Sequence, residues 1–414
     1  MSITSYPEYV RIKEGQGNVN LYGPALDAFG RIRISNPFTL FDSDHRYGDN
    51  GFFDTATTGT ASASFVANNA VVTLTVDAGS GDQVIRETKR VFNYQPGKSL
   101  LIMNTFVFNE AKAGLRQRVG YFSAENGIFL EQDGTTINLV RRSYVTGSVV
   151  DTKIAKANWN GDKLDGNGES GYTLDLTKAQ IFWVDVEWLG VGSVRCGFVI
   201  DGKFIVCHTF HHANLITGVY MTTATLPIRY EITNTAGTAS ESILKQICST
   251  VISEGGYEKK VKPSVVRMTT TKTVGTTIVP LITIRLASDK LDSVVLLKLF
   301  DVLPIASAAT TFEVQLIKNT TLTNDSYDTT TFSNIDFDLA ATALSGGTIL
   351  QSFYVSSSTQ SRNNLNIEEE YNFGFQLGRT IAGVSDKFTV AARTLSGTQS
   401  AISTLEFYDL TNGN

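Results

Sequence analysis

Cysteine, charge and basic surface are all scarce in this chain of 414 residues. The three cysteines, Cys196, Cys207 and Cys248, have no regular spacing and do not form a disulfide framework, which favours assembly in a reducing compartment. A Cys196–Cys207 bridge across a hairpin is an alternative to two buried free thiols. Only 18% of the residues are charged and the net charge is −5, whereas a dedicated nucleic-acid binder needs a basic face. The composition therefore predicts no nucleic-acid partner.

Long apolar runs are also missing. The sequence has no stretch of about 18 uncharged apolar residues, so we expect no membrane insertion. Residues 1–7 lack a charged segment followed by an apolar one, and we expect no secretory signal. Because 42% of the residues are hydrophobic, however, the chain can build a core, and its length predicts two or three domains.

The pattern of β-strands is what the sequence has in abundance. Residues 311–317 and 371–377 alternate apolar and polar side chains at a spacing of two, as half-buried strands do. Asp133-Gly134 and Asp201-Gly202 each separate two apolar runs and predict tight hairpins. Residues 243–251 fit a helix or a strand equally well. Short strands divided by turns, without interleaved helices, predict an all-β chain of sandwiches or jelly rolls.

Composition divides the chain into four segments. Residues 1–50 carry few apolar runs and predict an extended N-terminal arm. Residues 51–255 hold many strands and all three tryptophans, enough for a large sandwich. A glycine, a charge run and a proline in residues 256–263 indicate a linker. Residues 264–414 are rich in Thr and Ser and predict a second β-sandwich.

The sharpest candidate for enzymatic chemistry is the segment 181–189, IFWVDVEWL. On a strand, Asp185 and Glu187 share a face at about 6–7 Å, and retaining glycosidases use two carboxylates roughly 5–5.5 Å apart. Trp183 lies on the same face and could stack on a sugar, which makes the three residues a candidate glycan-binding site. The segment resembles the strand motif of jelly-roll β-glucanases, but Trp183 replaces its first acidic residue and the third is unmatched. This broken motif favours a strand with a polar outer face over a catalytic site.

Histidines and a cysteine at close spacing, in CHTFHH at residues 207–212, form a candidate zinc site. On an extended strand His208 and His212 share a face, whereas His211 points the other way. A zinc site needs three or four converging ligands, and His45 is the only histidine elsewhere. The pattern therefore favours a strand end with partly exposed polar residues, and we expect no metal there.

Two further motifs are incomplete. In DKLDGNGE, residues 162–169, Asp165, Asn167 and Glu169 supply oxygens at alternate positions, but the EF-hand spacing is absent. A Gly-rich surface turn is favoured over a looser calcium site. Gly190-Val191-Gly192 begins like a dinucleotide fingerprint, but Arg195 stands where the third glycine belongs. We therefore expect no cofactor. Four basic residues near aromatics are interpreted as salt-bridged sandwich surface: Arg116, Arg118, Arg141 and Arg142.

Residues 26–43 read LDAFGRIRISNPFTLFDS. This stretch resembles the DAFGRLRVS-P-TLFDS opening of a widespread family of tailed-phage virion proteins. The likeness extends to about residue 256 through short segments: DKLDG (162–166), EWLGVG (187–192), GFVIDG (197–202) and PIRYEI (227–232). Members of that family are tail, baseplate or other virion structural proteins, with a central region similar to the concanavalin-like sandwich. The family has no settled catalytic residues, so the resemblance implies none here.

The resemblance implies a non-enzymatic virion part that assembles in the host cytoplasm with other virion proteins, as a homo-oligomer. Its arm would dock onto neighbouring subunits, because arginine and aromatic side chains carry interface energy. The expected anchors are Arg31, Arg33, Phe38, Phe41 and Tyr47. The alternatives are a glycan-binding adhesin or a capsid decoration protein that contacts host surface glycans, and, more weakly, a glycan depolymerase that uses Asp185 and Glu187.

Overall fold

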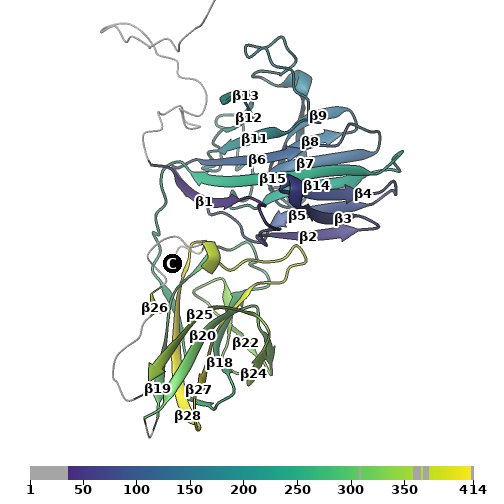
Figure 1. Cartoon of the computed structure of the whole chain (residues 1–414). Helices are drawn as coiled ribbons and strands as arrows, with labels where there is room; N and C mark the ends of the chain where they lie inside the picture. The colour runs from purple at the N-terminus through teal and green to yellow at the C-terminus, as the bar shows by residue number, and fades with distance from the viewer. Residues whose placement is uncertain (1–35, 307–308, 358–364, 367–372, 412–414) are drawn as a thin grey trace, which may run out of the picture.

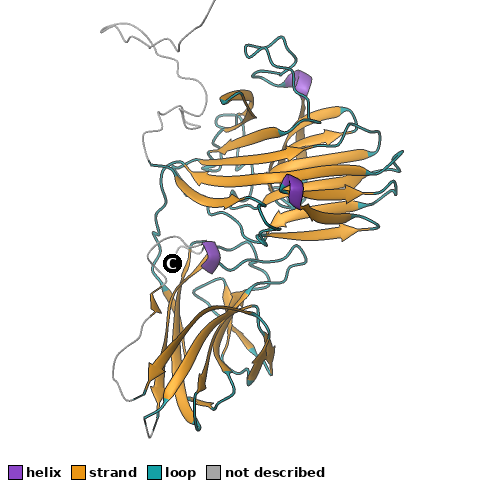
Figure 2. Ribbon diagram, viewed as in Figure 1, coloured by secondary structure: helices purple, strands orange, loops and turns teal. Residues whose placement is uncertain are grey.

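Two β-sandwiches, one following the other along the chain, make up the described structure (Figures 1 and 2). The computed structural model describes residues 36–306, 309–357, 365–366 and 373–411. Strands account for 53% of the residues and helices for 2%, so the predicted all-β fold class is confirmed. The helices are short 3-10 turns: η2 (Ala67–Asn69), η3 (Lys156–Asn158) and η4 (Phe373–Phe375). No helix among the described residues is long and apolar enough to cross a membrane.

The larger sandwich packs an eight-stranded sheet against a seven-stranded one (Figure 1). The first has the order β13-β12-β11-β6-β15-β4-β3. β4 pairs with the first half of β15, and β1 pairs with its second half on the same side. Its strands are β1 (Phe38–Ser43), β3 (Ser62–Val66), β4 (Val71–Val76), β6 (Leu100–Val107), β11 (Gln180–Val186), β12 (Val194–Ile200), β13 (Lys203–Phe210) and β15 (Ser242–Ser253). The second has the order β10-β9-β8-β7-β14-β5-β2. Its strands are β2 (Phe53–Thr58), β5 (Gln83–Thr88), β7 (Leu115–Phe122), β8 (Gly127–Asp133), β9 (Thr136–Ser143), β10 (Val150–Ala155) and β14 (Ile228–Asn234).

The smaller sandwich begins at residue 264. A five-stranded sheet contains β16 (Ser264–Arg267), β17 (Lys272–Val274), β19 (Val295–Ile305), β26 (Leu365–Asn366) and β28 (Gln399–Asp409). A six-stranded sheet contains β18 (Val279–Leu286), β20 (Thr311–Lys318), β22 (Tyr327–Thr329), β23 (Ile335–Asp338), β25 (Thr348–Ser356) and β27 (Lys387–Thr394). β21 (Thr321–Thr323) pairs with β24 (Ala343–Ser345). Each sandwich has its own buried hydrophobic cluster, so each has a core of its own.

Turn chemistry read from the sequence is confirmed at two hairpins. Asp201 and Gly202 join β12 to β13 with φ of 50° and 72°. At the other hairpin Asp133 is the last residue of β8, and Gly134, with φ of 57°, forms the turn to β9 together with Thr135. A two-residue turn with positive φ matches the twist of the strands it joins, which is why Asp-Gly pairs favour it. Residues 243–251, which fitted a helix or a strand, lie within β15.

One strand prediction is wrong. The alternation in residues 371–377 predicted a strand, but Phe373–Phe375 form the 3-10 turn η4. This segment crosses to the larger sandwich: the Arg90 Nε donates to the Gln376 carbonyl at 3.1 Å, and the Gln376 side chain donates to the Val91 carbonyl at 2.9 Å. Tertiary contacts have overridden the local pattern.

The contact between the two sandwiches continues through residues 378–381. The Arg379 amide donates to the Lys89 carbonyl at 2.6 Å, and the Ile381 amide donates to the Asp54 carboxylate at 2.7 Å. A Cβ atom on Gly378 would lie 2.6 Å from the Lys89 carbonyl oxygen, so the close approach of these two backbone segments requires glycine there. The two sandwiches therefore meet through a specific hydrogen-bonded surface.

Candidate functional site

The predicted glycan-binding residues on and just after β11 are buried. Phe182, Val184 and Val186 face the core between the sheets, which places Trp183 and Asp185 on the opposite face of the strand. Trp183 is nevertheless 0% exposed, because Phe204 covers it at 5.8 Å between ring centroids and Gly197 lies beneath it. Its ring cannot stack on a ligand, and the prediction of Trp183 as a sugar-stacking residue is corrected.

Both candidate acids interact with other side chains of the protein. Asp185 lies directly across from Arg195 on β12 and forms an ion pair with it, with 3.0 Å between the Arg195 Nε and the Asp185 Oδ2. Glu187 accepts a hydrogen bond from the Tyr94 hydroxyl at 2.9 Å. Burial, reinforced by the neighbouring Glu187 charge, raises the pKa of Tyr94 well above its usual value. With 1% and 0% exposure, the two carboxylates do not form an open acid–base pair.

The histidines of residues 207–212 do not converge. His208 Nδ1 accepts a hydrogen bond from the Asn160 amide at 3.2 Å, whereas the His212 Nδ1 lies 2.7 Å from the Gly192 carbonyl and its ring stacks on Tyr220 at 3.8 Å. Both rings are buried, which corrects the expectation of partly exposed side chains. Burial lowers the pKa of His212 to about 4, so the ring is neutral near pH 7. Among the described residues, no group of three or more His, Cys, Asp or Glu side chains could hold a metal ion.

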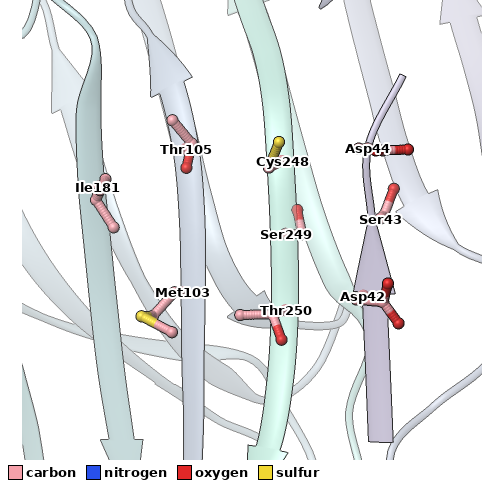
Figure 3. A pocket seen from close by; sticks show the side chains of 9 residues that line it. All are labelled: Asp42, Ser43, Asp44, Met103, Thr105, Ile181, Cys248, Ser249 and Thr250. Atoms are coloured by element: carbon pink, nitrogen blue, oxygen red, sulfur yellow. The ribbon is translucent and has the colours of Figure 1, made fainter. Parts of the chain in front are cut away.

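All three cysteines are free thiols in the structure, and Cys196 and Cys207 are buried. Cys248 is exposed in a shallow hollow of about 340 Å³ on the outer face of the eight-stranded sheet, where β11, β6, β15 and β1 run side by side (Figure 3). Burial, together with the nearby Asp44, raises the pKa of Cys248. A raised pKa disfavours the nucleophilic thiolate, and none of the nine lining residues is a histidine, lysine or arginine. The residues that line this hollow therefore provide no positive charge that would stabilise a Cys248 thiolate.

A larger hollow lies beside the edge strand β13. It has a volume of about 630 Å³ and is walled by Phe204, Tyr172, Lys203, Glu169 and the turn at residues 161–170. That turn contains residues 162–169, for which the sequence favoured a Gly-rich surface turn over a calcium site. Its Asp162 carboxylate accepts the amides of Leu164 at 2.8 Å and Ser170 at 2.7 Å, so its oxygens serve the loop itself. Although burial opposes it, these hydrogen bonds lower the pKa of Asp162.

The predicted arm anchors differ in where they lie and in how exposed they are. Arg31 and Arg33 lie outside the described residues. Phe41 is 3% exposed and belongs to the core of the larger sandwich, and Phe38 stacks on Tyr257 at 5.7 Å. Tyr47 is 86% exposed. Because β1 is a strand of the sandwich, the arm cannot extend to residue 50, and Phe41 is not free to anchor a neighbour.

A chain of alternating charges crosses the seven-stranded sheet on the face turned away from the core. We call it the charge ladder, and its members in spatial order are Lys153, Glu131, Arg118, Glu231, Arg229, Glu87, Arg379 and Asp292. From Lys153 to Glu87 the successive N–O distances lie between 2.6 and 3.2 Å. Arg379 of the smaller sandwich pairs with Glu87 and, at 2.8 Å, with Asp292. The ladder therefore joins the two sandwiches.

The middle of the charge ladder is buried and packs on two phenylalanine rings. The Phe122 and Phe129 rings pack in a tilted arrangement, with 4.3 Å between their centroids. Arg118 lies over Phe129 at 5.3 Å, and Arg229 lies over Phe122 at 5.5 Å. Glu231 is 3% exposed and Arg118 is 6% exposed. Of the arginines interpreted from the sequence as salt-bridged surface, Arg118 and Arg142 are buried and ion-paired. Arg116 is half-buried and pairs with Glu231, whereas Arg141 is half-buried and donates to the Thr152 hydroxyl. Sequence reasoning missed this cluster, although the alternation of charged and apolar residues in 228–232 is a signal for it.

Replacing Arg379 with alanine is expected to loosen the contact between the two sandwiches. The variant loses the ion pairs with Glu87 and Asp292 but keeps the main-chain bond to Lys89. In calorimetry we expect the smaller sandwich to unfold at a lower temperature than the larger one. The free energy of interaction between the two sandwiches should fall by about 2 kcal/mol. The matched control is Arg393→Ala, because Arg393 pairs with Glu313 within the smaller sandwich. Equal loss of coupling in both variants would contradict a role for the ladder.

Known proteins show only a distant structural likeness to the chain. No family model matches the chain, and no curated protein matches it. It is similar to a protein of unknown function from Shewanella oneidensis MR-1, with 11% identity, a TM-score of 0.36 and coverage of 59% of this chain and 100% of that one. It is also similar to the Emp47p carbohydrate recognition domain (10% identity, TM-score 0.33, 53% and 97% covered) and to a β-1,3-glucanase from Mycobacterium marinum (9%, 0.34, 51% and 98%). The likeness is one of β-sandwich architecture and extends to no particular activity.

Proposed function

We propose that the chain is a non-enzymatic structural component of a tailed-phage virion, assembled with other virion proteins in the host cytoplasm. The observation that carries the proposal is the segment 26–43, with its resemblance to the opening motif of that protein family. The last six residues of the segment are β1, which pairs with β15. The end of the motif is therefore part of the larger sandwich, as expected for a segment that links a folded domain to its assembly.

The state of the candidate acids supports a non-enzymatic role. Glycoside hydrolysis by two carboxylates requires both to face the scissile bond, with room for water. Asp185 is held by Arg195 and Glu187 by Tyr94, and both are buried. A depolymerase that used this pair would have to break both interactions before substrate could bind.

The ionic and main-chain contacts between the sandwiches also fit a structural part. A virion component has to keep its orientation relative to its neighbours, and a hinge between its domains would weaken that. Here Arg379, Gln376 and Ile381 bind the larger sandwich at four separate points: Glu87, Lys89, Val91 and Asp54. The contacts favour a two-domain unit with one orientation.

Deletion of residues 1–35 tests the proposal in the encoding phage. This deletion ends before β1, so the sandwich keeps every strand that the structure describes, and we expect the thermal transition to match that of the full chain. The full chain should be detected by mass spectrometry in purified particles, and the truncated chain should be absent from them. Absence of the full chain from particles would refute the virion role. Normal incorporation of the truncated chain would refute the role of the arm alone.

A further inference from the structure

We propose that the hollow beside β13 binds one neutral pyranose residue of a glycan. The inference goes beyond the structural role and does not depend on it. The hollow has a volume of about 630 Å³, within the range of small-molecule sites. Its walls combine two aromatic rings, Phe204 and Tyr172, with the charged side chains of Lys203, Glu169 and Asp162. The Asp162 oxygens already accept hydrogen bonds from amides of the turn.

The aromatic wall is fixed before any ligand arrives. Phe204 packs edge to face on the fully buried Trp183, which holds its ring from behind. Tyr172 packs against the core, and its hydroxyl donates to the Asp201 carboxylate at 2.8 Å. One side of a pyranose ring is a surface of C–H groups, and burying that surface on an aromatic ring is favourable. Two rings that need no reordering lower the entropic cost of binding.

The charged wall selects for hydroxyl groups. Within the described part of the chain, neither the Lys203 ammonium nor the Glu169 carboxylate has a hydrogen-bond or ion-pair partner, and both residues are exposed. A sugar hydroxyl donates to a carboxylate and accepts from an ammonium, so a single pyranose can satisfy both groups. An anionic ligand would be repelled by the Glu169 and Asp162 carboxylates, and a cationic one would be repelled by the Lys203 ammonium. The pair therefore favours a neutral polyhydroxylated ring.

The backbone around the hollow argues against an extended peptide as the ligand. A peptide would add to the free edge of β13 through main-chain hydrogen bonds. The Gly161 and Asp162 amides already donate to the Cys207 and Val206 carbonyls, both at 2.9 Å. A Cβ atom on Gly168 would lie 2.2 Å from an Asp162 carboxylate oxygen, so the turn is packed tightly on itself. This end of the edge is thus closed to β-addition, while the side-chain walls stay open.

Saturation-transfer NMR on the full chain tests the inference. The probes are the methyl β-glycosides of glucose, galactose and N-acetylglucosamine at millimolar concentration, and an acetylated, amidated hexapeptide of alternating Val and Thr. We expect at least one glycoside to receive saturation at its ring C–H protons. Glu169→Ala and Tyr172→Ala should each lower the affinity for that glycoside about tenfold or more. Glu169 is exposed, so its replacement is expected to leave the fold intact. The matched controls are Glu110→Ala and Tyr354→Ala, which change exposed residues away from the hollow.

Each outcome decides the inference. Saturation that both hollow variants lose and both control variants keep supports it. No saturation of any glycoside, saturation unaffected by Glu169→Ala and Tyr172→Ala, or saturation of the hexapeptide alone would overturn it. None of these results bears on whether the chain is found in virions, so the two proposals fail separately.

Discussion

Replacing Glu231 with glutamine is expected to destabilise the larger sandwich by about 3 kcal/mol, the low end of the cost of removing one partner from a buried ion pair. Glu231 faces three arginines, with N–O distances of 3.5 Å to Arg116, 3.2 Å to Arg118 and 3.1 Å to Arg229. The glutamine amide cannot neutralise their charge, so the buried guanidinium groups would lose their common counterion. For a sandwich of this size the melting temperature should fall by about 10 °C.

The matched control is Glu110→Gln, which neutralises an exposed carboxylate on the same sandwich. It should change the free energy of unfolding by less than about 0.5 kcal/mol. The double variant Glu231→Gln/Arg229→Met should lose less stability than the sum of its single variants, because the two residues share one interaction. Additive losses, or equal losses in Glu231→Gln and the control, would show that the charge ladder does not stabilise the fold.

The pH dependence of stability provides an independent check on Glu231. Burial alone would raise its pKa, but the charges of Arg229, Arg118 and Arg116 outweigh burial and lower the pKa below its usual value of 4.5. A lowered folded-state pKa contributes stability that is present above pH 4.5 and is lost as the pH falls through the lowered value. Denaturant unfolding below pH 4.5 should therefore show a steeper loss for the unsubstituted chain than for Glu231→Gln. Parallel curves would contradict the lowered pKa.

The sequence predicted those parts of the fold that depend on neighbouring residues. Asp201-Gly202 needs only its own backbone preference to form a hairpin, and residues 311–317 need only a spacing of two to be identified as a strand. Sheet order is different. On one of its sides β15 (residues 242–253) pairs with both β1 and β4, and both of these strands lie far from β15 in the sequence. No local pattern specifies such a pairing.

The site predictions failed where cross-strand register decides burial. The sequence places Trp183 on the polar face of its strand, and that is where it lies. It is buried because glycine at 197 leaves room for the ring and Phe204 closes over it. Glu231 meets Arg118 because β14 pairs with β7 in a register that sets the two residues directly opposite each other. An alternating pattern indicates which residues share a face, but not which residues on that face will cover one another.

Phe41 is the residue at which sequence and structure give opposite roles, and Phe41→Ala distinguishes them. The ring is 3% exposed and lies 5.1 Å from Phe92, 5.9 Å from Phe52 and 6.0 Å from Phe53, measured between centroids. Truncating a buried phenylalanine removes its burial energy and leaves a cavity, at a cost of about 3–5 kcal/mol. We therefore expect the isolated chain to unfold at a midpoint lowered by about 10 °C.

Tyr47→Ala is the control, since the sequence gave Tyr47 the same role as an anchor and the structure leaves it 86% exposed. It should change the stability of the isolated chain by less than about 0.5 kcal/mol. Thermal unfolding of the two purified variants, followed by circular dichroism, measures the difference. If Phe41 anchored a neighbouring subunit and not the core, its replacement would leave the isolated chain as stable as Tyr47→Ala does and would act only on assembly. A melting curve of Phe41→Ala that coincides with that of Tyr47→Ala would therefore place β1 outside the sandwich and restore the arm to residue 50.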